Sequence, residues 1–358
     1  MRYRIDAGLM LAVVSVLAAS LVNLYGVSSA VGPGLLLRQA VWGVIGLAVL
    51  WACSLISSTF WEKVAPKIYA LCIIGLIAVL FLGQVRGGTR GWFVFGPISL
   101  QPSEFARLGT MLLVAAFLGK REEDLLDLRA FVLLSAIVGL PVALVLAEPD
   151  LGVALTFLPA LVIGWWLGGL KRRVWVSLCL LAAITAGVAW VRVLKPYQKE
   201  RVLTVLDSER DPYGAGYQVR QSRIAVGSGR LIGEGIGGGS QSVLRFLPAQ
   251  HTDFAFAAWA ESTGFVGGSA LLIAFGVILF RLGLLTEKTD QRFGLGFATV
   301  VFAWLAFQII VNLGMVLGWL PTTGITLPLF SYGGSSVIST CATLGIVQSI
   351  WRHRFVNQ

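Results

Sequence analysis

Long apolar runs, separated by short polar connections, recur along the whole chain. A helix needs about 20 mostly apolar residues to cross a bilayer, and these runs are close to that length. The pattern therefore predicts an all-α, polytopic integral membrane protein with about ten transmembrane helices. The predicted spans cover residues 7–25, 35–58, 64–83, 102–119, 130–147, 152–170, 174–193, 262–285, 293–317 and 335–351.

A long polar segment interrupts this pattern between the seventh and eighth spans, at about residues 194–261. It is too polar to cross a membrane, too long for a plain connector, and contains a glycine-rich run from Gly227 to Gly239. Short apolar patches within it indicate that it lies on or dips into the membrane surface. We expect one membrane domain over residues 1–358, with this segment as its long extracytoplasmic loop.

The positions of the basic residues predict the orientation in the cytoplasmic membrane. Lysine and arginine gather in every second connection, and such an excess is typical of cytoplasmic loops. We therefore expect a multi-pass protein with both termini in the cytoplasm. The net charge of +10 follows from this orientation and from the mixed charges of the long loop, so we expect membrane lipids and no nucleic acid as partners.

Acidic residues at the predicted outer ends of the spans are the candidate chemistry. A carboxylate near hydrocarbon is costly, so it needs a partner or a function. Glu104, Asp150, Asp253 and Glu261 all lie at or near outer helix starts. Glu104 and Arg107 are three residues apart on one helix face and can pair. Asp150 is a candidate site residue, although it can equally cap the helix that follows it.

Asp253 is the strongest candidate for a general base. If this stretch is helical, Asp253 and Glu261 lie on one face, with only the small side chain of Ala257 between them. Apolar, aromatic and small residues surround Asp253, and such surroundings suit a carboxylate that accepts a proton. A local helix cap is the structural alternative. His251 nearby is more often a structural hydrogen-bonding residue than a catalytic one.

The stretch Gly333-Gly334-Ser335-Ser336 is a candidate phosphate site. It precedes the last span, where successive backbone N–H groups, two hydroxyls and a helix N-terminus can cradle an anion. An ordinary turn before a helix would use the same residues, so both interpretations stay open.

Arginines on the predicted outer side are further candidates for phosphate contact. Arg86 and Arg90 flank a glycine pair, and Arg210 lies in the long loop. Arginine suits bidentate phosphate binding, whereas contact with lipid headgroups is the alternative. One outer histidine and no outer cysteine make a zinc site unexpected, but Mg²⁺ or Mn²⁺ held by carboxylates stays open. Together these groups indicate a lipid-linked anionic substrate at the outer leaflet.

Several long motifs resemble those of the SEDS family (shape, elongation, division and sporulation proteins). The short termini resemble those of the elongation member, RodA, more than those of the division member, FtsW. The resemblance covers nearly the whole chain, in the order of the family. The motifs are RGGTRGW at 86–92, SLQPSEFA at 99–106, EPDLG at 148–152, DPYGAGYQ at 211–218, HTDF at 251–254 and SYGGSS at 331–336.

The resemblance implies a peptidoglycan glycosyltransferase that polymerises lipid II at the outer face of the membrane during cell elongation. It also implies a class B penicillin-binding protein and other elongation-complex proteins as partners. By the motifs, Asp253 matches the family's essential aspartate and Glu104 the acid of its fourth helix. The family usually has lysine where this chain has Arg107, so we expect Arg107 to bind phosphate or pair with Glu104. A lipid II flippase is the main alternative, and a non-catalytic scaffold is a third.

Overall fold

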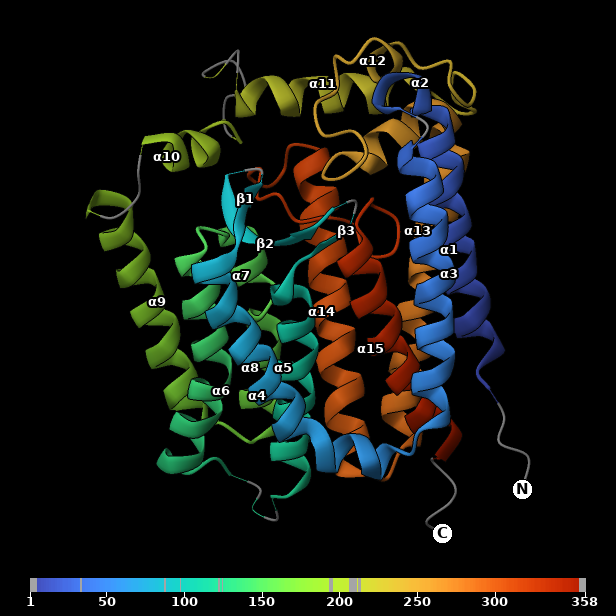
Figure 1. The fold of residues 1–358 in the computed structure, drawn as a ribbon. Coiled ribbons are helices and arrows are strands. Elements are labelled where there is room, and N and C mark those ends of the chain that lie inside the picture. The colour runs from blue at the N-terminus through green and yellow to red at the C-terminus, as the bar shows by residue number, and fades with distance from the viewer. Residues whose placement is uncertain are drawn as a thin grey trace.

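The protein is a bundle of upright helices with short helices lying across one end (Figure 1). The computed structural model describes residues 5–32, 34–86, 88–96, 98–121, 123, 125–192, 196–205, 211 and 214–353. Within these residues, seven helices are long and apolar enough to cross a membrane. The prediction of a polytopic all-α membrane protein is confirmed.

Each predicted span coincides with a helix or a helix pair. The span expected at 102–119 is the helix Pro102–Gly119. The helix Ser58–Leu82 begins six residues before its predicted span, and Ala255–Lys288 extends beyond its span at both ends. The others agree within a few residues. The upright helices are α1 (Ala7–Gly26), α3 (Gly34–Leu55), α4 (Ser58–Leu82), α5 (Pro102–Gly119), α6 (Leu128–Ala147), α7 (Leu151–Leu155), α8 (Leu158–Leu167), α9 (Arg172–Arg192), α13 (Ala255–Lys288), α14 (Arg292–Val316) and α15 (Gly334–His353).

The sixth predicted span, 152–170, is broken into the two helices α7 and α8. Pro159 has no backbone N–H group, so it cannot donate to the carbonyl of Leu155 as a continuous helix would require. Helix α7 ends at Leu155. The hydroxyl of the next residue, Thr156, donates to the carbonyl of Val153 (2.6 Å). The break places a polar side chain inside the bundle.

The long polar segment lies across the end of the bundle opposite the start of α1 and the end of α15 (Figure 1). Its described part forms α10 (Pro196–Leu203), α11 (Ala215–Ser228) and α12 (Ser240–Val243). The short helix α2 (Ser28–Val31) lies at the same end. The polar segment and the basic connections therefore occupy opposite ends of the molecule, as the charge pattern predicted.

A small antiparallel sheet, which the sequence pattern did not predict, stands between α4 and α5. Its strands β1 (Gln84–Arg86), β2 (Thr89–Phe95) and β3 (Ile98–Leu100) are arranged in chain order. The tight β1–β2 connection includes Gly88 with a φ of 87°, a backbone conformation that glycine adopts without strain. The candidate Arg86 and Arg90 thus lie on a folded hairpin at the end where the polar segment lies.

Helices α3 and α15 pack with their backbones close together because glycines line their contact. A Cβ atom on Gly46 would lie 3.0 Å from the Sγ of Cys341, and one on Gly345 would lie 2.5 Å from the carbonyl oxygen of Leu50. Small residues are the usual means of close helix approach inside a membrane. This contact holds α15, and the turn before it, against α3.

The close contact predicts a cost for one added methyl group. We expect Gly345→Ala to lower stability by about 1–3 kcal/mol, because backbone atoms must move. The matched control is Gly43→Ala on α3, where a Cβ meets nothing within 4 Å and helix propensity favours alanine. Thermal unfolding of both variants in lipid nanodiscs measures the difference. Equal midpoints for the two variants would contradict this packing.

Candidate active site

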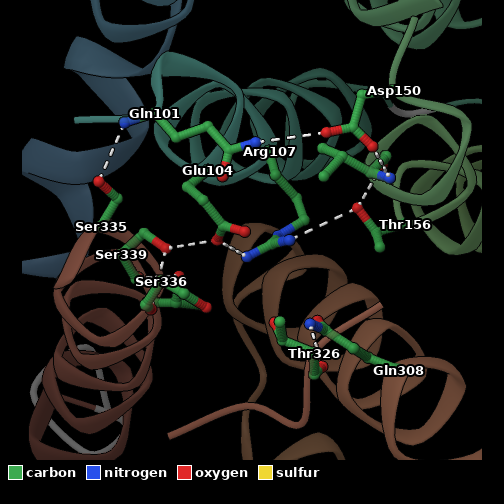
Figure 2. Close-up of polar contacts among 12 residues, drawn as sticks. Gln101, Glu104, Arg107, Asp150, Thr156, Gln308, Thr326, Ser335, Ser336 and Ser339 are labelled. Carbon is green, nitrogen blue, oxygen red and sulfur yellow. Dashed lines mark hydrogen bonds and ion pairs between the residues drawn. The ribbon is translucent and has the colours of Figure 1, made fainter. Parts of the chain in front are cut away.

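A buried ion pair occupies the first turn of α5. Arg107 Nη2 donates to Glu104 Oε2 across one helical turn (Figure 2). Only 5% of Glu104 and 2% of Arg107 is exposed. Pro102 starts this helix without needing a partner for an N–H group, and an acid in the first turn is favoured by the helix dipole. The sequence expectation that these two charges pair agrees with this geometry.

Side chains from three neighbouring elements contact the pair, and Figure 2 shows two of them, Ser339 and Thr156. Ser339 of α15 donates its hydroxyl to Glu104 (3.2 Å), and Arg107 donates to the hydroxyl of Thr156 (3.4 Å) at the α7–α8 break. The ring of Trp304 on α14 lies 4.4 Å from the Arg107 guanidinium carbon. These contacts satisfy much of a charge pair that would otherwise be costly in the bundle interior.

Asp150 is a helix cap, the structural alternative that the sequence left open, and its role as a site residue stays a prediction. Its Oδ1 caps α7 by accepting from Val153 N (3.0 Å), and its Oδ2 accepts from Gln101 Nε2 (3.4 Å) just before α5 (Figure 2). Burial raises the pKa of Asp150, and the negative charge of Glu104 adds to this effect. Asp150 therefore connects the α6–α7 junction to the residue before α5.

Glu148, the first residue of the EPDLG motif, is a buried acid. It is 0% exposed, and within the described part of the chain neither carboxylate oxygen has a hydrogen-bond partner. Burial raises its pKa to about 8, and repulsion from Asp150 contributes. Gly91 of β2 makes room for it, because a Cβ there would lie 2.6 Å from Glu148 Oε2. Only the three-dimensional packing of β2 on this junction reveals the burial.

Asp253 lies in the turn immediately before α13 and is half-buried. Asn312 of α14 holds this turn by donating to the backbone oxygens of Asp253 (2.9 Å) and Ile325 (2.7 Å). Gly324 lies beside the carboxylate, since a Cβ on it would be 3.7 Å from Asp253 Oδ2. The candidate base is thus placed by main-chain contacts and has a residue without a side chain next to it.

The same turn is tied to the segment that leads into α15. Ser331 donates its hydroxyl to the carbonyl of Thr252 (2.7 Å), and Tyr332 N donates to the carbonyl of His251 (2.8 Å). The rings of His251 and Tyr332 are also in edge contact, with centroids 6.0 Å apart. Burial lowers the pKa of His251, which favours the neutral form of its ring. Two of the motifs that are distant in sequence therefore form one unit.

The expectation that Asp253 and Glu261 share a helix face is wrong. Helix α13 begins only at Ala255, so the helical spacing does not reach Asp253. The carboxylate of Glu261 instead accepts from the backbone N–H groups of Gln241 (2.7 Å) and Ser242 (3.0 Å). Glu261 is fully buried and holds the start of α12.

Packing and hydrogen bonds to neighbouring elements account for three residues of the stretch 333–336. A Cβ on Gly334 would lie 2.7 Å from the ring of Trp42, so glycine is needed for the contact with α3. Gly333 N donates to Gln39 Oε1 (3.3 Å). The hydroxyl of Ser335 accepts from Gln101 N (3.0 Å), which fastens α15 to the start of α5 (Figure 2).

Ser336 is half-buried, and its carbonyl accepts from the hydroxyl of Ser339 (3.2 Å). Phosphate binding at the start of α15 stays a prediction.

Arg86 and Arg90 are exposed on β1 and β2, and the backbone N–H of Arg90 donates to the carbonyl of Glu148 (3.2 Å). Arg210 lies outside the described residues.

Metal binding was left open by the sequence. Among the described residues, no group of three or more His, Cys, Asp or Glu side chains could hold a metal ion. The acids near the site each have a different neighbour: Glu104 pairs with Arg107, and Asp150 caps α7. A divalent cation at this site stays a prediction.

Comparison with known proteins identifies the family. A family model described as cell cycle protein, for FtsW, RodA and SpoVE, matches residues 3–355. The chain belongs to the FtsW/RodA/SpoVE family. It is 38% identical to the peptidoglycan glycosyltransferase MrdB of Escherichia coli over 323 residues, 90% of this chain and 86% of MrdB. It is 35% identical to a probable peptidoglycan glycosyltransferase FtsW of Nitrosococcus halophilus over 315 residues, 87% of this chain and 81% of that protein.

Solved structures share the fold of this FtsW/RodA/SpoVE family member. One chain comes from a study of how a peptidoglycan synthase complex coordinates polymerization and crosslinking. It superposes with a TM-score of 0.84 at 37% identity, over 98% of both chains. The rod shape determining protein RodA of Thermus thermophilus gives a TM-score of 0.71 at 33% identity, also over 98% of both chains. The resemblance noted from the motifs is confirmed.

The buried pair predicts that removing the charge of Arg107 lowers stability far more than removing an exposed charge. Arg107→Gln leaves Glu104 buried without its cation, and we expect a loss of about 3–5 kcal/mol. Glu123→Gln is the matched control, because its pair with Arg121 (3.1 Å) leaves the Glu123 side chain 73% exposed and is worth about 0–1 kcal/mol. Unfolding midpoints in nanodiscs measure both. An Arg107→Gln protein as stable as the control would contradict the assignment.

The buried acid predicts a pH-dependent stability. Because folding raises the pKa of Glu148 from 4.5 to about 8, the folded state holds a proton in this range that the unfolded state has lost. The contribution of Glu148 to the free energy of unfolding therefore falls as pH rises through this range, and it no longer changes above it. We expect the midpoint of Glu148→Gln minus that of the parent protein to grow between about pH 4.5 and about 8. A difference that does not change with pH would contradict the burial of this carboxyl group.

Proposed function

We propose that this protein is a peptidoglycan glycosyltransferase that polymerises lipid II into glycan strands during cell elongation. The family and the names of its relatives support this activity. The observation that carries it is the position of Asp253, in a turn held by Asn312 and by the segment before α15. Helix α15, which follows that segment, contacts Gln101 through Ser335, directly before the helix α5 that bears the buried ion pair.

The chemistry requires one proton acceptor and a charged region for the leaving group. Asp253 accepts the proton of the acceptor sugar's 4-hydroxyl, and that oxygen forms a bond to the anomeric carbon of the donor. The bond from this carbon to undecaprenyl diphosphate breaks, so the sugar configuration inverts and the diphosphate takes the electron pair. Gly324 adds no side chain beside this carboxylate, where a Cβ would lie 3.7 Å from Asp253 Oδ2.

Positive groups must stabilise the leaving diphosphate. Arg86 and Arg90 are exposed on the hairpin at the end of the bundle where Asp253 lies, and the N-terminus of α15 points its backbone N–H groups toward that end. Arg107 is neutralised by Glu104 and buried, so in this proposal the pair positions α5, α14 and α15 for the substrate. Asp150 positions Gln101 in the same way, and no step uses a metal ion.

The setting of the reaction follows from the two ends of the bundle. The polar segment, Asp253 and the hairpin face the outer leaflet, and both termini lie in the cytoplasm. A class B penicillin-binding protein is the proposed partner. The similarity to a chain of a peptidoglycan synthase complex that joins polymerization with crosslinking supports this partner.

Removal of the base predicts loss of glycan synthesis from purified lipid II. We expect Asp253→Asn to lower the rate by about 10²–10⁴-fold, because a positioned base contributes that much. The matched control is Asp290→Asn, an exposed acid between α13 and α14 at the opposite end, which should polymerise normally. Assays with and without the partner and with and without chelator define the requirements. Near-normal product from Asp253→Asn would remove Asp253 from the base role, and lipid movement without any glycan product would favour a flippase.

A further inference from the structure

An exposed apolar patch lies where α13 bends. Helix α13 contains a kink at Gly264, which has non-helical φ and ψ values of 65° and −162°. The four side chains around the kink are mostly exposed: Leu231 70%, Ile232 82%, Phe265 68% and Val266 61%. We call these four residues the kink patch. Two of them belong to the extracytoplasmic loop and two to the membrane-spanning helix.

The loop half of the patch is bonded directly to the helix backbone. Phe265 N donates to the carbonyl of Arg230 (2.8 Å), and Val266 N donates to the carbonyl of Leu231 (3.1 Å). Gly264 permits this approach, because a Cβ there would lie 2.6 Å from Leu231 O. The height of the loop along the bilayer normal is therefore set by the helix.

The length of α13 places the patch at the outer edge of the hydrocarbon. Toward the inner end, Leu285 is the last apolar residue before Thr286, Glu287 and Lys288. From there to Phe265 is about 20 residues, and at a rise of about 1.5 Å each this distance is about 30 Å, the thickness of a hydrocarbon core. Leu231, bonded at the same level, is also at this boundary.

The patch continues the exposed apolar face of α13. Exposed apolar side chains follow it at Leu272 (39%), Ile273 (66%) and Phe280 (63%). Leu272 and Ile273 lie seven and eight residues after Phe265, and Phe280 lies eight and seven residues after them, spacings that keep these side chains on one side of a helix. Since lipid covers this side of a spanning helix, the same apolar medium reaches the kink.

Two charged residues near the kink patch, Glu234 and Arg230, are placed where lipid headgroups would lie. The carboxylate of Glu234 turns back to accept from Ser240 N (3.3 Å). Arg230 is exposed beside the patch, and a long cationic side chain at this level can reach lipid phosphates while its stem stays in apolar surroundings. Charge and apolar area are therefore complementary to the outer leaflet.

We propose that Leu231 and Ile232 insert, with Phe265 and Val266, into the outer leaflet and anchor the extracytoplasmic loop there. The occupant of the patch is lipid. This anchor holds the outer end of α13, and with it the Asp253 turn, at a fixed height above the acyl chains. The insertion itself does not depend on the proposed activity.

Spin-label accessibility tests the insertion. The four native cysteines are replaced by alanine, and a nitroxide is attached at Ile232→Cys in phosphatidylethanolamine–phosphatidylglycerol nanodiscs. Ser240→Cys, an exposed position in the same loop, is the matched control. Collisions with apolar O₂ and with a water-soluble nickel chelate are then compared. We expect an O₂-to-nickel ratio several-fold higher at 232 than at 240, because oxygen concentrates in acyl chains.

Two results would overturn the proposal. Equal ratios at 232 and 240 would place the loop in water. A high ratio at 232 that is lost when a class B penicillin-binding protein is added would make the patch a protein-docking surface instead. Leu231→Cys provides a second position if labelling at 232 disturbs folding, and the unfolding midpoint of each labelled protein shows whether it is intact.

Discussion

A charged group inside a membrane bundle must have its partner there, and the Glu104–Arg107 pair meets this constraint. Neither charge reaches water, so a helix bundle that separated them would leave a carboxylate or a guanidinium alone in a medium of low dielectric constant. Ser339, Thr156 and Trp304 supply the remaining contacts. The pair therefore forces α5, α14, α15 and the α7–α8 break into one relative arrangement.

The candidate base depends on this arrangement through short links. Gln101, directly before α5, meets the hydroxyl of Ser335 in α15, and the segment before α15 holds the carbonyls of the turn that bears Asp253. Asn312 of α14 joins the same turn to the loop at Ile325. Most of these links use backbone groups. The turn that bears Asp253 is thus held mainly by contacts to its backbone carbonyls.

The sequence predicted the parts that depend on local pattern. The apolar runs located the spans, and the i, i+3 spacing of Glu104 and Arg107 indicated their pairing, because both follow from helical geometry. Pro159 is a local signal for the break between α7 and α8, but the prediction of spans from apolar runs did not use it. The hairpin carrying Arg90, the burial of Glu148 and the separation of Asp253 from Glu261 depend on which elements meet in space, and no spacing along the chain encodes that.

The central claim is that Asp253 takes part in bond formation and not in holding the substrate. The most direct test measures both quantities on one variant: the affinity of Asp253→Asn for lipid II in nanodiscs, and the rate of its first glycosidic bond at saturating lipid II. The account predicts an affinity close to that of the parent protein together with a nearly abolished bond-forming rate. A variant that fails to bind, or one that binds and still forms the bond at the normal rate, would contradict it.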